Sequence, residues 1–149
     1  MQTDGIIRQT TDFSCGPAAL SLLLKTKYEV SIEEMDVISD ILYRSEKGAE
    51  LNKIQSGFSL LDLKNEAERL GFRASGVKFS QNEDISPFLP MIILLEERTY
   101  SHFVVLTRVQ EGYADLLDPQ TGKLHMPLYQ FKSYWKGYAL MTGDAYDKD

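Results

Sequence analysis

The hydrophobic pattern of this chain changes once, close to Gly71, and that change sets the fold class. Before Gly71, apolar residues recur at helical spacing in three segments, over residues 18–27, 31–43 and 59–70. After it, short runs rich in β-branched and aromatic residues alternate with turn residues. Helices followed by strands predict an α+β fold, in which N-terminal helices pack on a C-terminal antiparallel sheet.

Residues typical of helix ends divide the first half of the chain. Ser31 and Glu34 have the spacing of a capping box, which predicts that the second helix opens there. Ser59 is expected to cap the third helix and Gly71 to end it, and the polar segment 45–57 between the two is expected to be an exposed loop. The inward faces should carry Ile32, Met35, Ile38 and Leu42 in the second helix and Leu60, Leu63, Ala67 and Leu70 in the third.

The second half predicts strands at residues 72–79, 91–96, 102–109, 113–117, 123–126 and 138–141. The turns at 110–112 and 118–122 are so short that the strands they join should be antiparallel neighbours. The aromatic residues between Phe131 and Trp135 are expected to pack mainly in the core.

Length and composition fit one domain, residues 1–149, with its core over about 6–142 and a charged tail, 143–149, that is expected to fray. The net charge is −6 and there is no basic run, which argues against nucleic acid and anionic membranes as partners. The longest apolar stretches, 18–24 and 91–95, are far shorter than the roughly 20 residues of a membrane span. One cysteine rules out an internal disulfide and a cysteine-based zinc site, and we expect no metal or cofactor.

That cysteine, Cys15, stands two residues before Pro17, and an apolar run follows at once. Proline is well tolerated in the first turn of a helix, where its missing N–H would have no partner. Cys15 is therefore expected at a helix N-terminus, where unpaired N–H groups and the helix dipole favour a negative charge. Cysteines in such positions have lowered pKa values and act as nucleophiles. The simpler alternative is a small buried apolar residue.

A cysteine nucleophile needs a base, and the chain offers His102 and His125. His102 opens an apolar strand, so its imidazole is placed to point over the sheet end towards a helix N-terminus. His125 lies between Leu124 and Met126 in a shorter strand. Each is also compatible with a purely structural role, and both are candidates on these grounds.

Asp118 is the best candidate to orient the histidine. It follows the strand 113–117, and with a turn centred near Gln110 and Glu111, position 102 would pair with a residue close to 118 or 119. The alternative role is that of a turn-starting residue ahead of Pro119.

Gln9, six residues before Cys15, is a fourth candidate. Its amide can donate to an oxyanion together with the backbone N–H of Cys15. Taken alone, a glutamine is more often a solvated surface residue.

These residues resemble the motifs of the bacteriocin-processing, or double-glycine, peptidases, which are papain-like cysteine peptidases of bacteria. The resemblance runs from about residue 6 to residue 142 and is carried by segments 9–20, 59–72 and 102–106, by Asp118-Pro119 with Gly122, and by Trp135 and Gly137 with the strand that follows. Ser14 and Ser101 differ from the exporter-type pattern, which has Asp before the cysteine and a small residue such as Gly before the histidine.

The resemblance implies a papain-like fold and cleavage after a Gly-Gly or Gly-Ala pair in a peptide leader. It implies Cys15 as nucleophile, His102 as general acid and base, Asp118 as the residue that orients His102, and Gln9 in the oxyanion hole. The best-known members are N-terminal domains of ABC exporters, so the implied partners are a peptide or protein leader and an export system. Without membrane helices or a nucleotide-binding motif here, we expect either a free-standing member, periplasmic or secreted after loss of a leader or else cytoplasmic, or a domain of a larger protein.

Two other functions fit the same residues. The first is a peptide-binding module without proteolysis, against which a retained thiol argues. The second is an acyl transferase or amidase, because Cys-His-Asp chemistry serves transfer to an amine as readily as to water.

Overall fold

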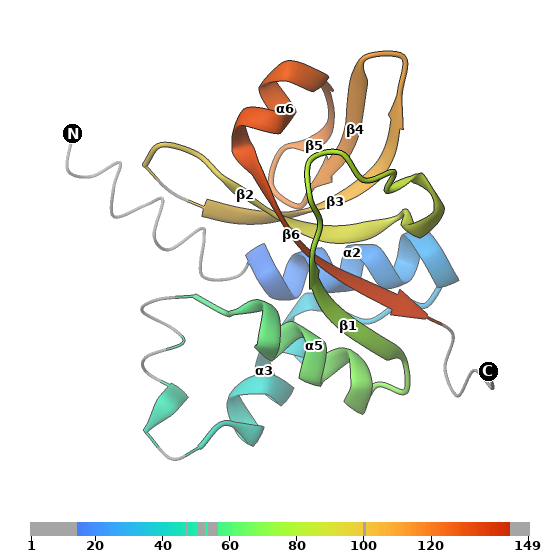
Figure 1. The fold of residues 1–149 in the computed structure, drawn as a ribbon. Coiled ribbons are helices and arrows are strands. Elements are labelled where there is room, and N and C mark those ends of the chain that lie inside the picture. The colour runs from blue at the N-terminus through green and yellow to red at the C-terminus, as the bar shows by residue number, and fades with distance from the viewer. Residues whose placement is uncertain (1–14, 47, 51–52, 54–56, 100, 144–149) are drawn as a thin grey trace.

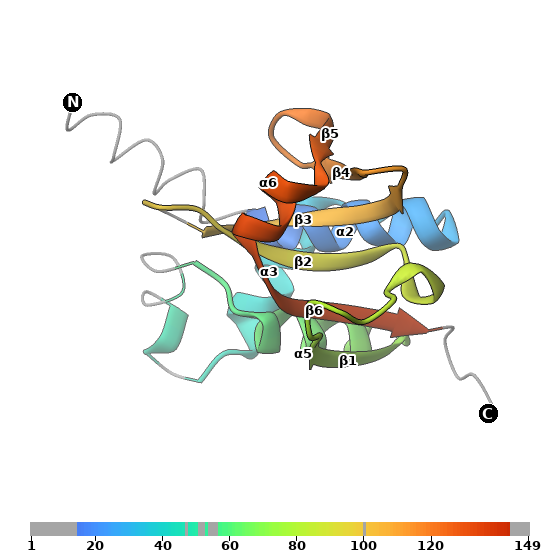
Figure 2. The ribbon, with the colours of Figure 1, turned by 45° about the horizontal axis from the view of Figure 1, so that its top comes forward.

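The computed structural model describes residues 15–46, 48–50, 53, 57–99 and 101–143. Three of its helices precede the sheet in the chain: α2 (Cys15–Tyr28), α3 (Glu34–Arg44) and α5 (Leu60–Arg69). Helices α2 and α5 cover one face of the sheet, and α3 packs on both of them (Figure 1). A later helix, α6 (Leu128–Tyr134), lies on the opposite face, as the turned view shows (Figure 2).

The sheet has six strands in the order β1-β6-β2-β3-β4-β5, and every neighbouring pair is antiparallel. The strands are β1 (Arg73–Lys78), β2 (Met91–Glu96), β3 (Ser101–Gln110), β4 (Tyr113–Asp118), β5 (Gly122–Pro127) and β6 (Trp135–Gly143), with a short 3₁₀ turn, η1 (Ser86–Phe88), between β1 and β2. This is the predicted α+β, papain-like arrangement, with Cys15 at the start of the first described helix.

Two apolar cores lie on the two faces of the sheet. On the helical side, Leu20 of α2 and Leu63 of α5 pack with Val105 of β3. On the other side, Phe131 and Trp135 pack with Leu106. Central strands therefore alternate between two buried faces, which explains why β2 and β3 read as continuous apolar runs. The sequence analysis missed α6, although its expectation that Phe131 and Trp135 pack in the core is confirmed.

The capping box predicted at Ser31 is wrong. Helix α3 begins at Glu34, and Glu33 is its N-cap, with extended backbone and no side-chain capping bond. The residues before it stay extended because Ile32 packs against the helical core. The buried stripe is also rotated from the prediction: its members are Val37, Ile38 and Ile41, whereas the side chain of Met35 is exposed.

The start and end of α5 match the prediction. The Ser59 hydroxyl accepts from the Asp62 N–H while the Asp62 carboxylate accepts from the Ser59 N–H, a complete capping box. Gly71, with φ of +99°, ends the helix in the left-handed region that glycine favours. The segment before α5 is not simply an exposed loop: Lys53 is helical and partly buried, and its Nζ lies 2.8 Å from Asp62 Oδ1.

A buried carboxyl joins α3 to α5. Glu66 is 1% exposed and receives a hydrogen bond from Arg69 Nη2 at 2.7 Å. Asp40 of α3 lies beside it and accepts from Arg44 and from Arg69. Burial, aided by the neighbouring Asp40, raises the pKa of Glu66 to about 7, and the hydrogen bond from Glu66 lowers the pKa of Asp40. The two carboxyls thus share a proton near neutral pH.

Replacing Glu66 by Gln is expected to remove the loss of stability that the buried carboxyl of Glu66 causes when it ionises. With its pKa raised from 4.5 to about 7, Glu66 favours the folded state below pH 4.5, and this contribution is lost as pH rises through 7. The quantity to compare is the free energy of unfolding of Glu66→Gln minus that of wild type. This difference should rise by roughly 1–3 kcal/mol between pH 5 and pH 8. Urea unfolding at both pH values measures it, with Glu68→Gln on the same helix as control. An equal offset at both pH values would contradict the prediction.

Candidate active site

The thiol of Cys15 lies against the first residues of β3. Cys15 is 4% exposed, and its Sγ accepts a hydrogen bond from the backbone N–H of Phe103 at 3.4 Å. The approach is close: a Cβ at Gly16 would lie in van der Waals contact with Phe103 and Phe58, 3.4 Å from an atom of each. The helix start therefore places the sulfur next to the residue that follows His102.

His102 is held between strands at the sheet end. Its side chain is 8% exposed, and its Nε2 lies 3.4 Å from Oδ2 of Asp118, which is similarly buried. A carboxylate at this distance fixes the imidazole orientation and favours a proton on Nε2. Proton exchange with a thiol or a substrate is then left to Nδ1.

The two carboxylate oxygens of Asp118 have different partners. Oδ1 accepts from the backbone N–H of Gln120 at 2.8 Å and from that of Thr121 at 3.4 Å, which closes the turn from β4 to β5. Oδ2 faces His102. The turn-starting role and the histidine-orienting geometry therefore occur together in one side chain.

The cross-strand pairing that underlies this contact differs in detail from the prediction. The hairpin turn consists of Glu111 and Gly112, both with positive φ, as a two-residue hairpin loop requires. A bulge at Thr107 then shifts the register so that Val105 pairs with Leu117. Continued one step, this register puts Asp118 opposite residue 104. His102 and Asp118 are thus diagonal neighbours rather than a direct pair.

The second histidine lies elsewhere. His125 is on β5, where its ring stacks on Tyr113 with centroids 4.1 Å apart and its Nδ1 contacts Asp115. Its side chain is 64% exposed. The hydrogen bond from His125 lowers the pKa of Asp115. The structure therefore brings His102, not His125, to the strand end that carries the Cys15 contact.

Two further residues complete the comparison with the sequence. Gln9 lies outside the described residues, as does Ser14. Glu97, which the sequence analysis did not consider, places Oε2 3.8 Å from Nδ1 of His102. The signal that would have found it is strand pairing: Leu95 pairs with His102, so Glu97 is the diagonal neighbour on that side.

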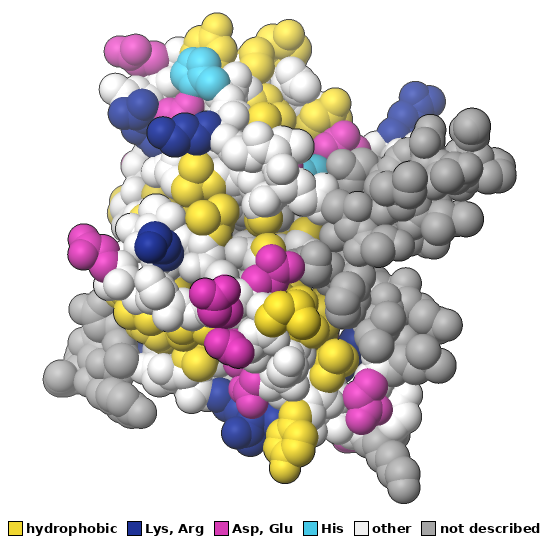
Figure 3. All heavy atoms as spheres, turned by 180° about the vertical axis from the view of Figure 1, so that it is seen from behind, with side chains coloured by type: hydrophobic (Ala, Val, Ile, Leu, Met, Phe, Trp, Pro, Cys, Tyr) yellow, Lys and Arg dark blue, Asp and Glu magenta, His cyan; other side chains and the backbone are white. Residues whose placement is uncertain are grey.

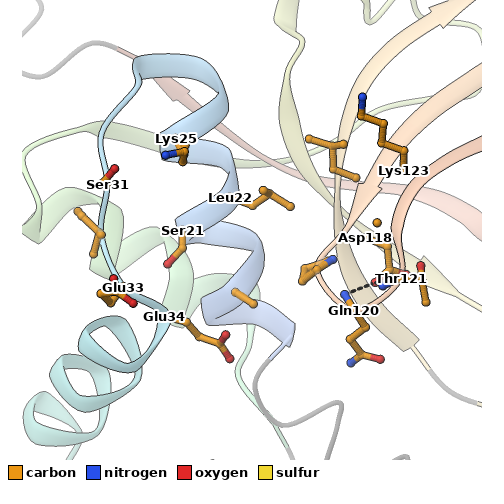
Figure 4. A pocket seen from close by; sticks show the side chains of 15 residues that line it. Ser21, Leu22, Lys25, Ser31, Glu33, Glu34, Asp118, Gln120, Thr121 and Lys123 are labelled. Atoms are coloured by element: carbon orange, nitrogen blue, oxygen red, sulfur yellow. Dashed lines mark hydrogen bonds between the residues drawn. The ribbon is translucent and has the colours of Figure 1, made fainter.

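A groove of about 770 Å³ runs beside Asp118, between α2 and the β4–β5 turn. Figure 4 shows Ser21, Leu22 and Lys25 of α2 on one side and Asp118, Gln120 and Thr121 on the other. Glu33 and Glu34 close it at the start of α3. The mixture of apolar and polar walls suits an extended peptide better than a highly charged ligand.

The face seen from behind is acidic and apolar in its middle (Figure 3). Acidic side chains gather there beside hydrophobic ones, while the basic side chains lie mostly towards the edges.

None of the helices that the structure describes is long and apolar enough to cross a membrane.

Comparison with known proteins finds a matching family and similar proteins. The model of the peptidase C39 family matches residues 3–146. A relative from Pseudomonas fluorescens, named "Probable functional amyloid protease FapD", is 35% identical over 144 residues, which are 96% of this chain and 62% of that protein. The "Lactococcin-G-processing and transport ATP-binding protein LagD" of Lactococcus lactis is 30% identical over 141 residues, 91% of this chain but 18% of its own length.

A solved structure is also similar. It is the crystal structure of a double glycine motif protease from an AMS/PCAT transporter in complex with the leader peptide, with a TM-score of 0.69 and 25% identity. The match covers 87% of this chain and 84% of that one.

Removing His102 is expected to slow alkylation of Cys15. At pH 7, His102→Ala should react with iodoacetamide about tenfold more slowly than wild type, because loss of the imidazole removes the base that accepts the thiol proton. His125→Ala is the matched control and should react at the wild-type rate. Since the chain has one cysteine, mass spectrometry of the whole protein measures the rate directly. Equal rates for all three proteins would contradict the prediction.

Proposed function

Because the chain belongs to the peptidase C39 family of cysteine peptidases, we propose that it is an endopeptidase that cleaves a peptide leader after a pair of small residues, with Cys15, His102 and Asp118 as its catalytic residues. The observation that carries the proposal is their convergence at one sheet end. Cys15 Sγ accepts from the amide next to His102, and His102 Nε2 lies 3.4 Å from Asp118.

Cleavage proceeds in two stages. The Cys15 thiolate attacks the scissile carbonyl carbon and forms a C–S bond, while the developing oxyanion is held by the backbone N–H of Cys15 and the Gln9 amide. As the C–N bond breaks, Nδ1 of protonated His102 gives its proton to the leaving amine. His102 then takes a proton from water, which attacks the thioester, breaks the C–S bond and regenerates the thiolate. Asp118 keeps Nε2 protonated throughout.

The groove beside Asp118 supports the substrate class. It offers about 770 Å³ along α2, enough for several residues of an extended peptide. The neighbour solved with its leader peptide and the relatives named as a lactococcin-processing transporter and an amyloid protease support a secreted protein or peptide as the substrate. The chain spans 62% of the length of the amyloid protease relative. We also propose an export system as a partner.

A peptide panel tests the proposal. Purified protein is expected to cleave peptides containing Gly-Gly or Gly-Ala, and to leave matched peptides with Leu-Leu at that position intact. Cys15→Ala should reduce cleavage to the background rate, measured by mass analysis of the products. Equal cleavage by both proteins would refute the mechanism. Binding without cleavage would favour the peptide-binding module, and an amide product with an added amine would favour acyl transfer.

Two substitutions separate the functions of Asp118. Asp118→Asn keeps an oxygen that accepts from the Gln120 N–H, so the turn should survive, but the charge facing His102 is lost. We expect the rate of cleavage to fall on the order of 100-fold with little change in stability. Asp118→Ala should lose the same activity and, in addition, about 1 kcal/mol of unfolding free energy, because the turn also loses its acceptor. Full activity of Asp118→Asn in the peptide assay would reduce Asp118 to a turn residue.

A further inference from the structure

His102 lies between two carboxylates, one at the end of β4 and one just after β2. On the β4 side, Asp118 faces Nε2 at 3.4 Å, and on the β2 side, Glu97 faces Nδ1 at 3.8 Å. Both are diagonal neighbours across the sheet, so they share the face of His102. The catalytic mechanism proposed above uses Asp118 and gives Glu97 no role.

Glu97 differs from Asp118 in exposure. The Asp118 side chain is 9% exposed, whereas that of Glu97 is 33% exposed and can meet a bound peptide. Glu97 also lines a hollow of about 700 Å³, together with Ser101 of β3 and Tyr134 at the end of α6. A carboxylate that lies next to both His102 and an open hollow is placed to contact a bound substrate.

The position of Nδ1 indicates which part of the substrate lies near Glu97. To protonate the leaving amine, Nδ1 must come within about 3.2 Å of its nitrogen. That nitrogen is then at most about 7 Å from Glu97 Oε2, because Oε2 is 3.8 Å from Nδ1. The amine belongs to the first residue after the scissile bond, and the side chain of a lysine or arginine at that residue is long enough to reach the carboxylate.

Other charges line the same hollow. Glu96, Arg98 and Lys136 contribute one negative and two positive groups. Arg98 and Lys136 are exposed, so water and salt screen them strongly. Glu96 pairs with Ser101, and by strand alternation its side chain points to the opposite face from that of Glu97. Glu97 is therefore the charged group of the hollow that lies against the imidazole.

We propose that Glu97 is a specificity-determining residue that favours substrates with a lysine or arginine immediately after the scissile bond and disfavours those with an acidic residue there. This inference rests on the proposed peptidase function and on the assignment of Nδ1 as the acid.

Three peptides that differ only at this residue test it: one with Gly-Gly followed by Lys, one followed by Ala and one followed by Glu. For the wild-type protein, kcat/KM should be about two- to fivefold higher for Lys than for Ala and lower by a similar factor for Glu, as for a partly exposed ion pair. In Glu97→Gln the three values should converge. Glu96→Gln, the matched control, should keep the wild-type order of the three peptides. Added salt should reduce the differences in kcat/KM among them.

The possible failures are distinguishable. If no peptide is cleaved in a Cys15-dependent manner, the proposed function is wrong. If cleavage depends on Cys15 but wild type and Glu97→Gln have the same order of preference, only the present inference is overturned. If Glu97→Gln lowers kcat/KM equally for all three peptides, Glu97 orients His102 and does not select the substrate, which also overturns it.

Discussion

The close approach of α2 to β3 is the constraint on which the rest of the site depends. It brings the start of a helix to the end of an apolar strand. Gly16 lies at this approach, where a Cβ would be in van der Waals contact with Phe103 and Phe58, 3.4 Å from each. The amide of Phe103 then completes the environment of the sulfur. The helical core beneath, which includes Cys15 itself, holds the first turn in place.

The site spreads its chemistry over elements that are distant in the chain but adjacent in the sheet. β3 supplies the imidazole, β4 and the segment just after β2 supply carboxylates, and α2 supplies the thiol. A middle strand is the natural place for the histidine, because only there can it have diagonal neighbours on both sides. The helix α3, in contrast, is joined to α5 by the bonds that Arg69 makes to Asp40 and Glu66, and its first residue, Glu34, lines the groove.

Much of this was predictable from the sequence, and the failures have physical causes. The change from helical to strand-like spacing of apolar residues near Gly71 predicted the fold class. Both ends of β2 were predicted correctly because its apolar run ends abruptly. The order Cys15, His102, Asp118 was recognisable as a motif. The hairpin turn lies at Glu111 and Gly112, one position later than expected, so the pairing of position 102 was wrong by one or two residues, and the bulge at Thr107 offsets one residue of that shift. Ser31 failed as a cap because local propensity was overridden by the packing of Ile32. Glu97 was missed because only strand pairing connects it with His102.

The β3–β4 hairpin gives the molecule a convenient attachment point. Its tip, Glu111 and Gly112, is exposed and lies at the far end of β3 from His102, roughly 25–30 Å away at the rise of an extended strand. The bulge at Thr107 lies between the two, where the register shifts by one residue. A fluorophore-bearing loop or an affinity tag inserted there would lie far from His102, so the hairpin is a suitable site for immobilising the protein with its groove unobstructed.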